Sequence, residues 1–194
     1  MRGKQTMRVA AFLTAAIILL LPGFAVAQSS PPFTINREYR FAVIFPAEPS
    51  AKDISYTTRS GASFPARQFA VEQNGNQHII TIVDFAAGPA IDIQIVDQAA
   101  DALRARGEVR FQAAEEYDPG LPGRQLMILQ RDGRQLRASV YMWDHRLYIT
   151  EANGDPGATS LLQFEQSVTL LDADGNEVNL DADRFGGQGG RGGR

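Results

Sequence analysis

The sequence predicts an α+β fold in which two main helices pack on a largely antiparallel sheet of about six to eight strands, as an α/β/α sandwich. Segments that alternate apolar and polar side chains outnumber segments with helical spacing. Tight turns such as Asn74-Gly75 and Asp132-Gly133 join neighbouring segments, and connections this short join antiparallel strands. The 194 residues are 44% hydrophobic, which is enough for one domain with its own core.

The predicted strands form two groups of four, and one helix follows each group. Pro46 and Pro49 end the first strand. Asn74-Gly75 is the strongest hairpin signal, because both central residues of a type I′ turn need positive φ. A loop rich in Pro and Gly, residues 118–123, precedes the last three strands. The predicted strands cover residues 39–45, 53–59, 67–73, 77–85, 108–117, 124–131, 134–143 and 146–151.

Two segments change to helical spacing. The first predicted helix spans residues 96–106, and Gly107 is expected to end it as the residue after the C-cap. The second is expected to begin after Asp155-Pro156-Gly157, with Thr159 or Ser160 as its N-cap. The apolar residues that define these helices are Ile95, Val96, Ala99 and Leu103 in the first, and Leu161, Phe164, Val168 and Leu171 in the second.

Residues 1–27 match a secretory signal peptide. Three basic residues precede a continuous apolar run over 9–21, and Ala25-Val26-Ala27 provides the small-x-small pattern that signal peptidase needs. We expect cleavage after Ala27, which places the mature chain in the periplasm or outside the cell, without a membrane span. The alternative is an uncleaved membrane anchor, which Pro22-Gly23 disfavours because an anchor needs helix formers there.

The rest of the chain is expected to contain one domain with two loose ends. Residues 28–38 predict an extended lead-in, 39–182 a single α+β domain, and 183–194 a disordered tail of Gly and Arg. After cleavage, 16 basic residues face 22 acidic ones, which argues against nucleic acid as a partner. The sequence leaves the oligomeric state open.

Several kinds of chemistry are excluded or disfavoured by composition. Cysteine is absent, which excludes disulfides, thiolate nucleophiles and thiolate metal sites. Only two histidines occur, so a site of three histidines cannot form within one chain. His78 follows an Asn-Gly turn and is expected in solvent, while Asp144-His145 is expected to form a hairpin tip. No cofactor and no metal are therefore expected.

Two carboxylate patterns allow both a functional and a simpler structural interpretation. Asp172, Asp174 and Asp181 align with ligand positions of a calcium-binding loop, but Leu170 occupies the first position, where such a loop needs Asp. We expect a surface turn there. Glu115-Glu116 is a carboxylate pair on a predicted strand, where adjacent side chains point to opposite faces. The two carboxylates are therefore not expected to act together.

The segment Phe41-Ala-Val-Ile-Phe-Pro-Ala-Glu-Pro49 resembles the F-x-V-x-F-P-x-x-P start of small exported domains with a PsbP-like fold. A helix after the second hairpin, and a closing helix containing Leu161-Leu162-Gln163-Phe164, are also similar. The resemblance covers residues 39–171. It implies an antiparallel sheet between helices, in a family whose members mostly act as accessory or binding modules. It implies no metal ligand or partner-binding residue, because none can be matched by position.

One face of the last three predicted strands carries a candidate binding surface. Two-residue turns at Asp132-Gly133 and Asp144-His145 would collect core residues on one face, and arginines with Tyr and Trp on the other. That composition is typical of interface hot spots. The hairpin end is expected to be exposed, whereas Leu126 and Ile128 leave open whether a helix covers the middle. The candidate partner-binding residues are Tyr141, Trp143, Arg146, Tyr148, Arg124 and Arg137.

Two classes of function stay open. No G-x-S-x-G motif surrounds Ser60, Ser63 or Ser139. This absence, with the resemblance, favours an exported non-catalytic binding or accessory module, whose partner would be a protein or small molecule of the cell envelope. The alternative is a periplasmic enzyme whose site of Asp, Glu, Arg and Tyr follows no known motif. A concave pocket where such groups converge with shifted pKa values would separate the two classes.

Overall fold

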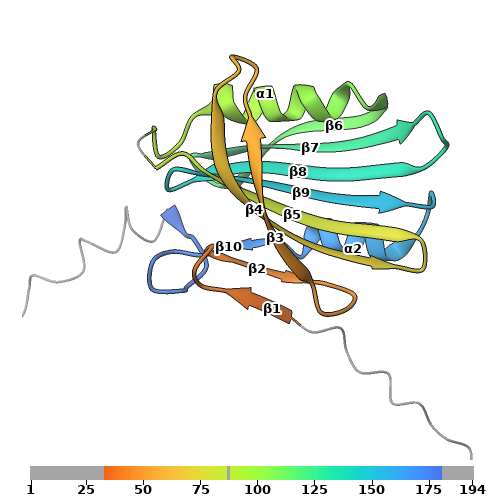
Figure 1. Ribbon diagram of the computed structural model, residues 1–194, viewed down its shortest axis with the longest axis horizontal. Helices are drawn as coiled ribbons and strands as arrows, with labels where there is room; N and C mark the ends of the chain where they lie inside the picture. The colour runs from red at the N-terminus through yellow and green to blue at the C-terminus, as the bar shows by residue number, and fades with distance from the viewer. Residues whose placement is uncertain (1–32, 87, 181–194) are drawn as a thin grey trace, which may run out of the picture. The chain divides into compact units, whose positions relative to one another are not determined.

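A seven-stranded antiparallel sheet forms the centre of the fold, in agreement with the predicted α+β class (Figure 1). The computed structural model describes residues 33–86 and 88–180. The predicted signal peptide, its cleavage site and the Gly/Arg tail lie outside the described residues. In spatial order the strands are β3 (Ser50–Thr57), β4 (Ser63–Gln73), β5 (Asn76–Asp84), β9 (Arg146–Gly154), β8 (Gln135–Trp143), β7 (Leu121–Gln130) and β6 (Gly107–Asp118).

A second, three-stranded sheet contains β1 (Phe33–Asn36), β2 (Phe41–Ile44) and β10 (Thr169–Leu170). β2 lies in the centre and pairs with both neighbours in antiparallel register. Part of the expected lead-in is therefore a strand of this sheet. The prediction placed all strands in one sheet, because short apolar runs do not show which partner strand they meet.

Helix α1 (Ile93–Arg104) begins three residues earlier than predicted, because Asp92 is its N-cap and accepts a hydrogen bond from the Gln94 backbone N–H at 2.8 Å. The helix ends at Arg104 with Ala105 as its C-cap, so Gly107 does not end it as predicted. It is the first residue of β6, and a β-carbon there would overlap the carbonyl oxygen of Leu129. The glycine permits a close approach of two strands.

Helix α2 (Thr159–Gln166) is shorter than predicted. Its N-cap is Ala158, which offers no side-chain hydrogen bond, so neither proposed capping residue serves that role. Val168 lies beyond the helix and Leu171 follows β10. The Ser167 hydroxyl donates to the Phe164 carbonyl and accepts from the Ile44 backbone N–H, both at 2.9 Å. These bonds end the helix and direct the chain into the small sheet.

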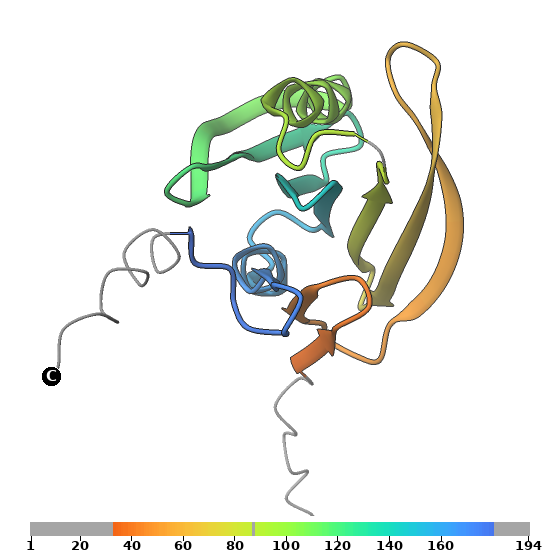
Figure 2. The same cartoon turned by 90° about the vertical axis from the view of Figure 1, so that its left-hand side faces the viewer.

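The two helices cover opposite faces of the large sheet (Figure 2). On one face, α1 packs against β6 to β9; on the other, α2 packs with β2 against the large sheet. Each face has its own apolar core, as the α/β/α prediction requires. The α1 core includes Val96, Leu103, Leu126, Ile128, Leu136 and Val140, and the α2 core includes Phe41, Phe45, Ile82, Tyr148, Leu161 and Phe164.

Two of the three predicted hairpin registers are confirmed. Gln73 pairs with Asn76 across Asn74-Gly75, and Trp143 pairs with Arg146 across Asp144-His145. Asn74, Gly75, Asp144 and His145 all have positive φ, as type I′ turns require.

The predicted register between β7 and β8 is wrong by one residue. Leu129 pairs with Gln135 rather than Leu136, and the Gln130 N–H donates to the Arg134 carbonyl at 2.8 Å. The loop therefore has three residues and ends at Gly133, whose φ is 83°. Because side chains alternate along a strand, this shift moves every β7 side chain to the other face. Leu126 and Ile128 thus lie under α1.

Candidate functional site

The six predicted binding residues do not form one surface. Tyr148 is fully buried and Tyr141 is 6% exposed, and both lie in the core between the large sheet and α2. Trp143 and Arg146 are half-buried. The loop before β2 covers the hairpin end that was expected to be exposed: Arg40 forms an ion pair with Asp144, and Arg146 donates to the Glu38 carbonyl at 2.8 Å.

Arg124 and Arg137 lie on opposite faces of the sheet, as a consequence of the β7–β8 register. The Arg124 Nε is 2.7 Å from Asp97 Oδ1 on α1. The Arg137 Nη2 is 3.2 Å from Glu165 Oε2 on α2. Each arginine is therefore neutralised by a carboxylate on the helix that covers its face. Partner binding by any of the six residues stays a prediction.

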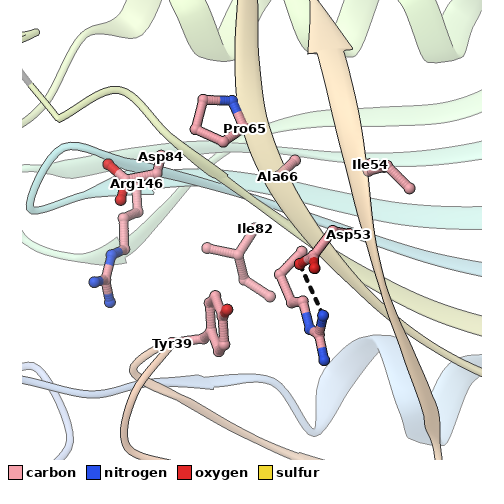
Figure 3. A pocket seen from close by; sticks show the side chains of 9 residues that line it. Tyr39, Asp53, Ile54, Pro65, Ala66, Ile82, Asp84 and Arg146 are labelled. Atoms are coloured by element: carbon pink, nitrogen blue, oxygen red, sulfur yellow. Dashed lines mark hydrogen bonds and ion pairs between the residues drawn. The ribbon is translucent and has the colours of Figure 1, made fainter.

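The strongest candidate site is a hollow of about 200 Å³ at one end of the α2 face, which we call the mixed-charge hollow (Figure 3). Arg146, the one predicted binding residue in its lining, stands at its edge. Ile82 and Tyr39 lie between Arg146 on one side and Asp53 on the other. The lining residues are Tyr39, Asp53, Ile54, Pro65, Ala66, Arg67, Ile82, Asp84 and Arg146.

Strand pairing positions the charged residues of this hollow. Asp53 pairs with Arg67, which in turn pairs with Ile82 on β5, and Asp84 pairs with Arg146 on β9. Neighbouring positions across strands share a face, so these side chains gather on one side of the sheet. The loop between β1 and β2 contributes Tyr39. Asp84 and Arg146 are 62 positions apart in the sequence. This distance explains why local patterns missed the site.

The hollow contains two Asp–Arg pairs at neighbouring strand positions, and only one of them forms an ion pair. Arg67 Nη1 is bonded to Asp53 Oδ1 at 2.7 Å. Asp84 accepts from the Ala86 N–H at 2.8 Å, and the Arg146 guanidinium points away from it toward the Glu38 carbonyl (Figure 3). Within residues 33–86 and 88–180, neither Asp84 nor Arg146 belongs to an ion pair.

Polar groups beside the hollow retain unused hydrogen-bonding capacity. Arg67 Nε, on a lining residue, and Trp143 Nε1, on the residue that pairs with Arg146, are buried without a hydrogen-bond partner among the described residues. Burial raises the pKa of Tyr148 to about 12, although the cationic Arg146 nearby opposes the shift. The hydroxyl therefore stays protonated at neutral pH. The local excess is one of donors, which favours an acceptor such as a carboxylate.

A second hollow of about 250 Å³, the acidic hollow, lies between the ends of β6, β7 and α2. Gln125 Nε2 and Ser139 Oγ are 2.7 and 2.5 Å from Glu165 Oε1, and the Tyr141 hydroxyl donates to Glu115 Oε2 at 2.9 Å. The lining residues are Glu115, Glu116, Tyr117, Gln125, Tyr141, Glu165, Gln166 and Val168.

The carboxylates of Glu115 and Glu116 were expected to point apart, yet both residues border the acidic hollow. β6 is an edge strand whose register shifts between Glu116 and Asp118, and such an irregularity bends the strand locally. Burial raises the pKa of Tyr117 and that of Tyr141. Both hydroxyls thus stay protonated at neutral pH and act as hydrogen-bond donors.

Both histidines contact other parts of the fold. His78 was expected in solvent, but it is 1% exposed and its ring meets Phe164 edge-on, with 5.3 Å between ring centroids. The strand that follows the turn is central, so its first residues are covered by α2. His145 lies at the hairpin tip, as predicted, and its Nδ1 is 2.6 Å from the Gly88 carbonyl oxygen.

The segment that resembles a calcium loop forms the predicted turn. Asp172 Oδ1 accepts from the backbone N–H groups of Asp174 and Asn176, both at 2.9 Å. Gly175 has a φ of 88°, and Leu171 bridges to Glu177 to close the turn. These hydrogen bonds lower the pKa of Asp172. Asp181 lies outside the described residues.

Comparison with known proteins identifies no relative: no family model and no curated protein matches the chain. Over residues 33–86 and 88–180, no helix is both long and apolar enough to cross a membrane. The same part of the chain contains no group of three or more His, Asp or Glu side chains placed to hold a metal ion.

Proposed function

We propose that this protein is an exported, non-catalytic binding or accessory module, and that the mixed-charge hollow is its ligand site. The export segment over residues 1–27 supports the location. The resemblance of residues 41–49 to PsbP-like domains supports a binding or accessory role. A small molecule of the cell envelope is the partner that a hollow of this size fits.

The observation that carries this proposal is the unpaired charge of Asp84 and Arg146 beside an apolar floor. Ion-paired arginines elsewhere, such as Arg124 and Arg137, have no charge left for a ligand. Arg146 donates to a neutral carbonyl and lies beside the Tyr148 hydroxyl, so no carboxylate among the described residues neutralises its charge. A small number of polar groups around an apolar surface is typical of ligand sites.

The alternative is an enzyme, and the acidic hollow is the observation that favours it. Glu115, Tyr141 and Glu165 converge there from three different elements. However, Glu165 already accepts hydrogen bonds from Gln125, Ser139 and Arg137, and the Tyr141 hydroxyl is bonded to Glu115. This network holds α2 against β7 and β8, and it supports a structural role in preference to catalysis.

Native mass spectrometry of the periplasmic protein tests the proposal. The mature chain is purified, and its intact mass should be that of a chain that begins at Gln28. It is then incubated with envelope extract and dialysed. We expect a bound small molecule that Arg146→Met and Asp84→Asn each lose. The matched control is Arg110→Met, because Arg110 pairs with Glu108 on the exposed edge strand and lies outside the hollow. Equal retention by all four proteins, or no bound molecule in any of them, would contradict the proposal.

A further inference from the structure

Asp84 and Arg146 are direct neighbours across β5 and β9, yet they do not neutralise each other. Opposite charges at paired positions in a sheet usually interact, since their β-carbons lie about 5 Å apart. Here the Arg146 guanidinium turns toward Glu38 and the Asp84 carboxylate toward the Ala86 N–H. The charged ends therefore point in different directions, and the mixed-charge hollow is the space that both residues border (Figure 3).

We infer that this space holds the ammonium and carboxylate groups of a free α-amino acid. The inference rests on the proposed function and names the class of its ligand. The ligand carboxylate would accept hydrogen bonds from Arg146, whose planar fork matches a carboxylate. The ligand ammonium would donate to Asp84, which is acceptor-only when ionised. Both charges of the ligand are then paired without changing the charge of the protein.

The apolar part of the hollow specifies the ligand's side chain. Ile82, which is 2% exposed, and Pro65 lie between the two Asp–Arg pairs, and the Tyr39 ring stands beside Ile82 (Figure 3). The Arg67–Asp53 pair closes the far side and is already neutral. An aliphatic side chain would bury apolar area against these residues. The ligand class is therefore an α-amino acid with an aliphatic side chain.

A zwitterionic lipid headgroup shares the same chemistry, because it also joins an ammonium group to an anionic group. Its charges are farther apart, and its acyl chains would need an open path to a membrane. Asp84 and Arg146 are adjacent, and the hollow is small, which favours the compact amino acid. Phosphoethanolamine is the soluble probe that distinguishes the two sources.

Isothermal titration calorimetry with four probes tests the inference on the mature protein. L-leucine carries both charges, N-acetyl-L-leucine only the anion, and L-leucinamide only the cation. We expect L-leucine to bind at one site per chain, and each singly charged analogue to bind at least about tenfold more weakly, because each loses one charge-assisted interaction. Phosphoethanolamine should also bind more weakly than L-leucine.

Variants assign the binding to the two charges. Arg146→Met and Asp84→Asn should each weaken L-leucine binding at least about tenfold. Asp84→Asn should also remove the difference between L-leucine and N-acetyl-L-leucine, which a merely structural defect would not do. The pair Glu108→Gln and Arg110→Met, on the exposed edge strand, should leave the affinity unchanged.

Three results would overturn the inference: equal binding of N-acetyl-L-leucine, tighter binding of phosphoethanolamine, or no L-leucine binding. The proposed function is judged separately by the envelope extract. If the protein retains an extract molecule through Arg146 but does not bind L-leucine, the ligand class is wrong and the binding function stands. If it retains nothing and binds none of the four probes, both fail.

Discussion

At the scale of single residues, ion pairing distinguishes Arg146 from the other two arginines of the predicted binding surface. Arg124 and Arg137 tie α1 and α2 to the sheet through Asp97 and Glu165. Arg146 has the same aromatic neighbours that made it a candidate in the sequence, but it lacks a carboxylate partner among the described residues. Its surroundings, and not its residue type, make it the best candidate for ligand binding.

The first residue-scale prediction concerns the buried pair of Arg137 and Glu165. The Glu165 side chain is 2% exposed and the Arg137 side chain 17%. Arg137→Met would leave a buried carboxylate without its cation, so we expect the free energy of unfolding to fall by about 3–5 kcal/mol. Urea denaturation at neutral pH measures the change.

The control for this prediction is Arg110→Met. Arg110 and Glu108 form an exposed ion pair, so the loss should be within about 1 kcal/mol. If both variants lost the same small amount of stability, the Arg137–Glu165 pair would not hold α2 in place as described.

The second residue-scale prediction concerns His78 and pH. Burial lowers the pKa of His78 below its ordinary value of 6.5, so the folded state resists protonation. The unfolded chain binds the proton more readily. The stability that neutral His78 contributes is therefore fully present above pH 6.5 and is lost as the pH falls below it.

Urea denaturation at pH 7.5 and pH 5.5 tests this dependence. We expect the wild type to lose more stability between these pH values than the variant His78→Phe, which has nothing to protonate at that position. A pH dependence that is the same in both proteins would show that His78 titrates normally in the folded state.

At the scale of elements, hairpin register decides which residues can form a site. The sequence predicts the β8–β9 register correctly, because Asp144-His145 forms the two-residue turn that was assumed. It fails for β7–β8, where the same kind of dipeptide, Asp132-Gly133, belongs to a three-residue loop. Local sequence does not distinguish the two loop lengths, and the choice alone moves Arg124 to the α1 face.

The helices and the small sheet show the same limit of local patterns. α1 was predicted nearly as it forms, because its apolar residues recur along one side of the helix. α2 ends before Val168 because Ser167 bonds both the helix end and β2, a contact between residues 123 positions apart. The pairing of β10 with β2, and of Asp84 with Arg146, depends on similarly distant contacts.

The element-scale prediction concerns Gly123, which was assigned to a loop but lies in β7 opposite Tyr141. A β-carbon at this position would overlap the Tyr141 ring. We expect Gly123→Ala to displace the ring and lower the free energy of unfolding by about 1–3 kcal/mol. Thermal and urea denaturation measure this, and a variant as stable as the wild type would contradict the register of β7 against β8.

At the scale of the whole described domain, two covered faces leave a limited number of places for a ligand. α1 covers one face, and α2 with the small sheet covers most of the other. The mixed-charge hollow lies where the loop between β1 and β2 meets β3, β4, β5 and β9. The α/β/α architecture could be predicted from sequence patterns, whereas this meeting point could not, because it brings the distant β9 and the loop at Tyr39 onto β3, β4 and β5.

The central claim is that the mixed-charge hollow is the ligand site, and chemical-shift mapping tests it most directly. Two-dimensional ¹H–¹⁵N spectra of the protein from Gln28 onward are recorded during titration with L-leucine. We expect saturating shift changes to concentrate at Tyr39, Arg67, Asp84 and Arg146 and to leave the acidic hollow unchanged. Shift changes that concentrate at Glu115, Tyr141 and Glu165, or no saturating change anywhere, would contradict this claim.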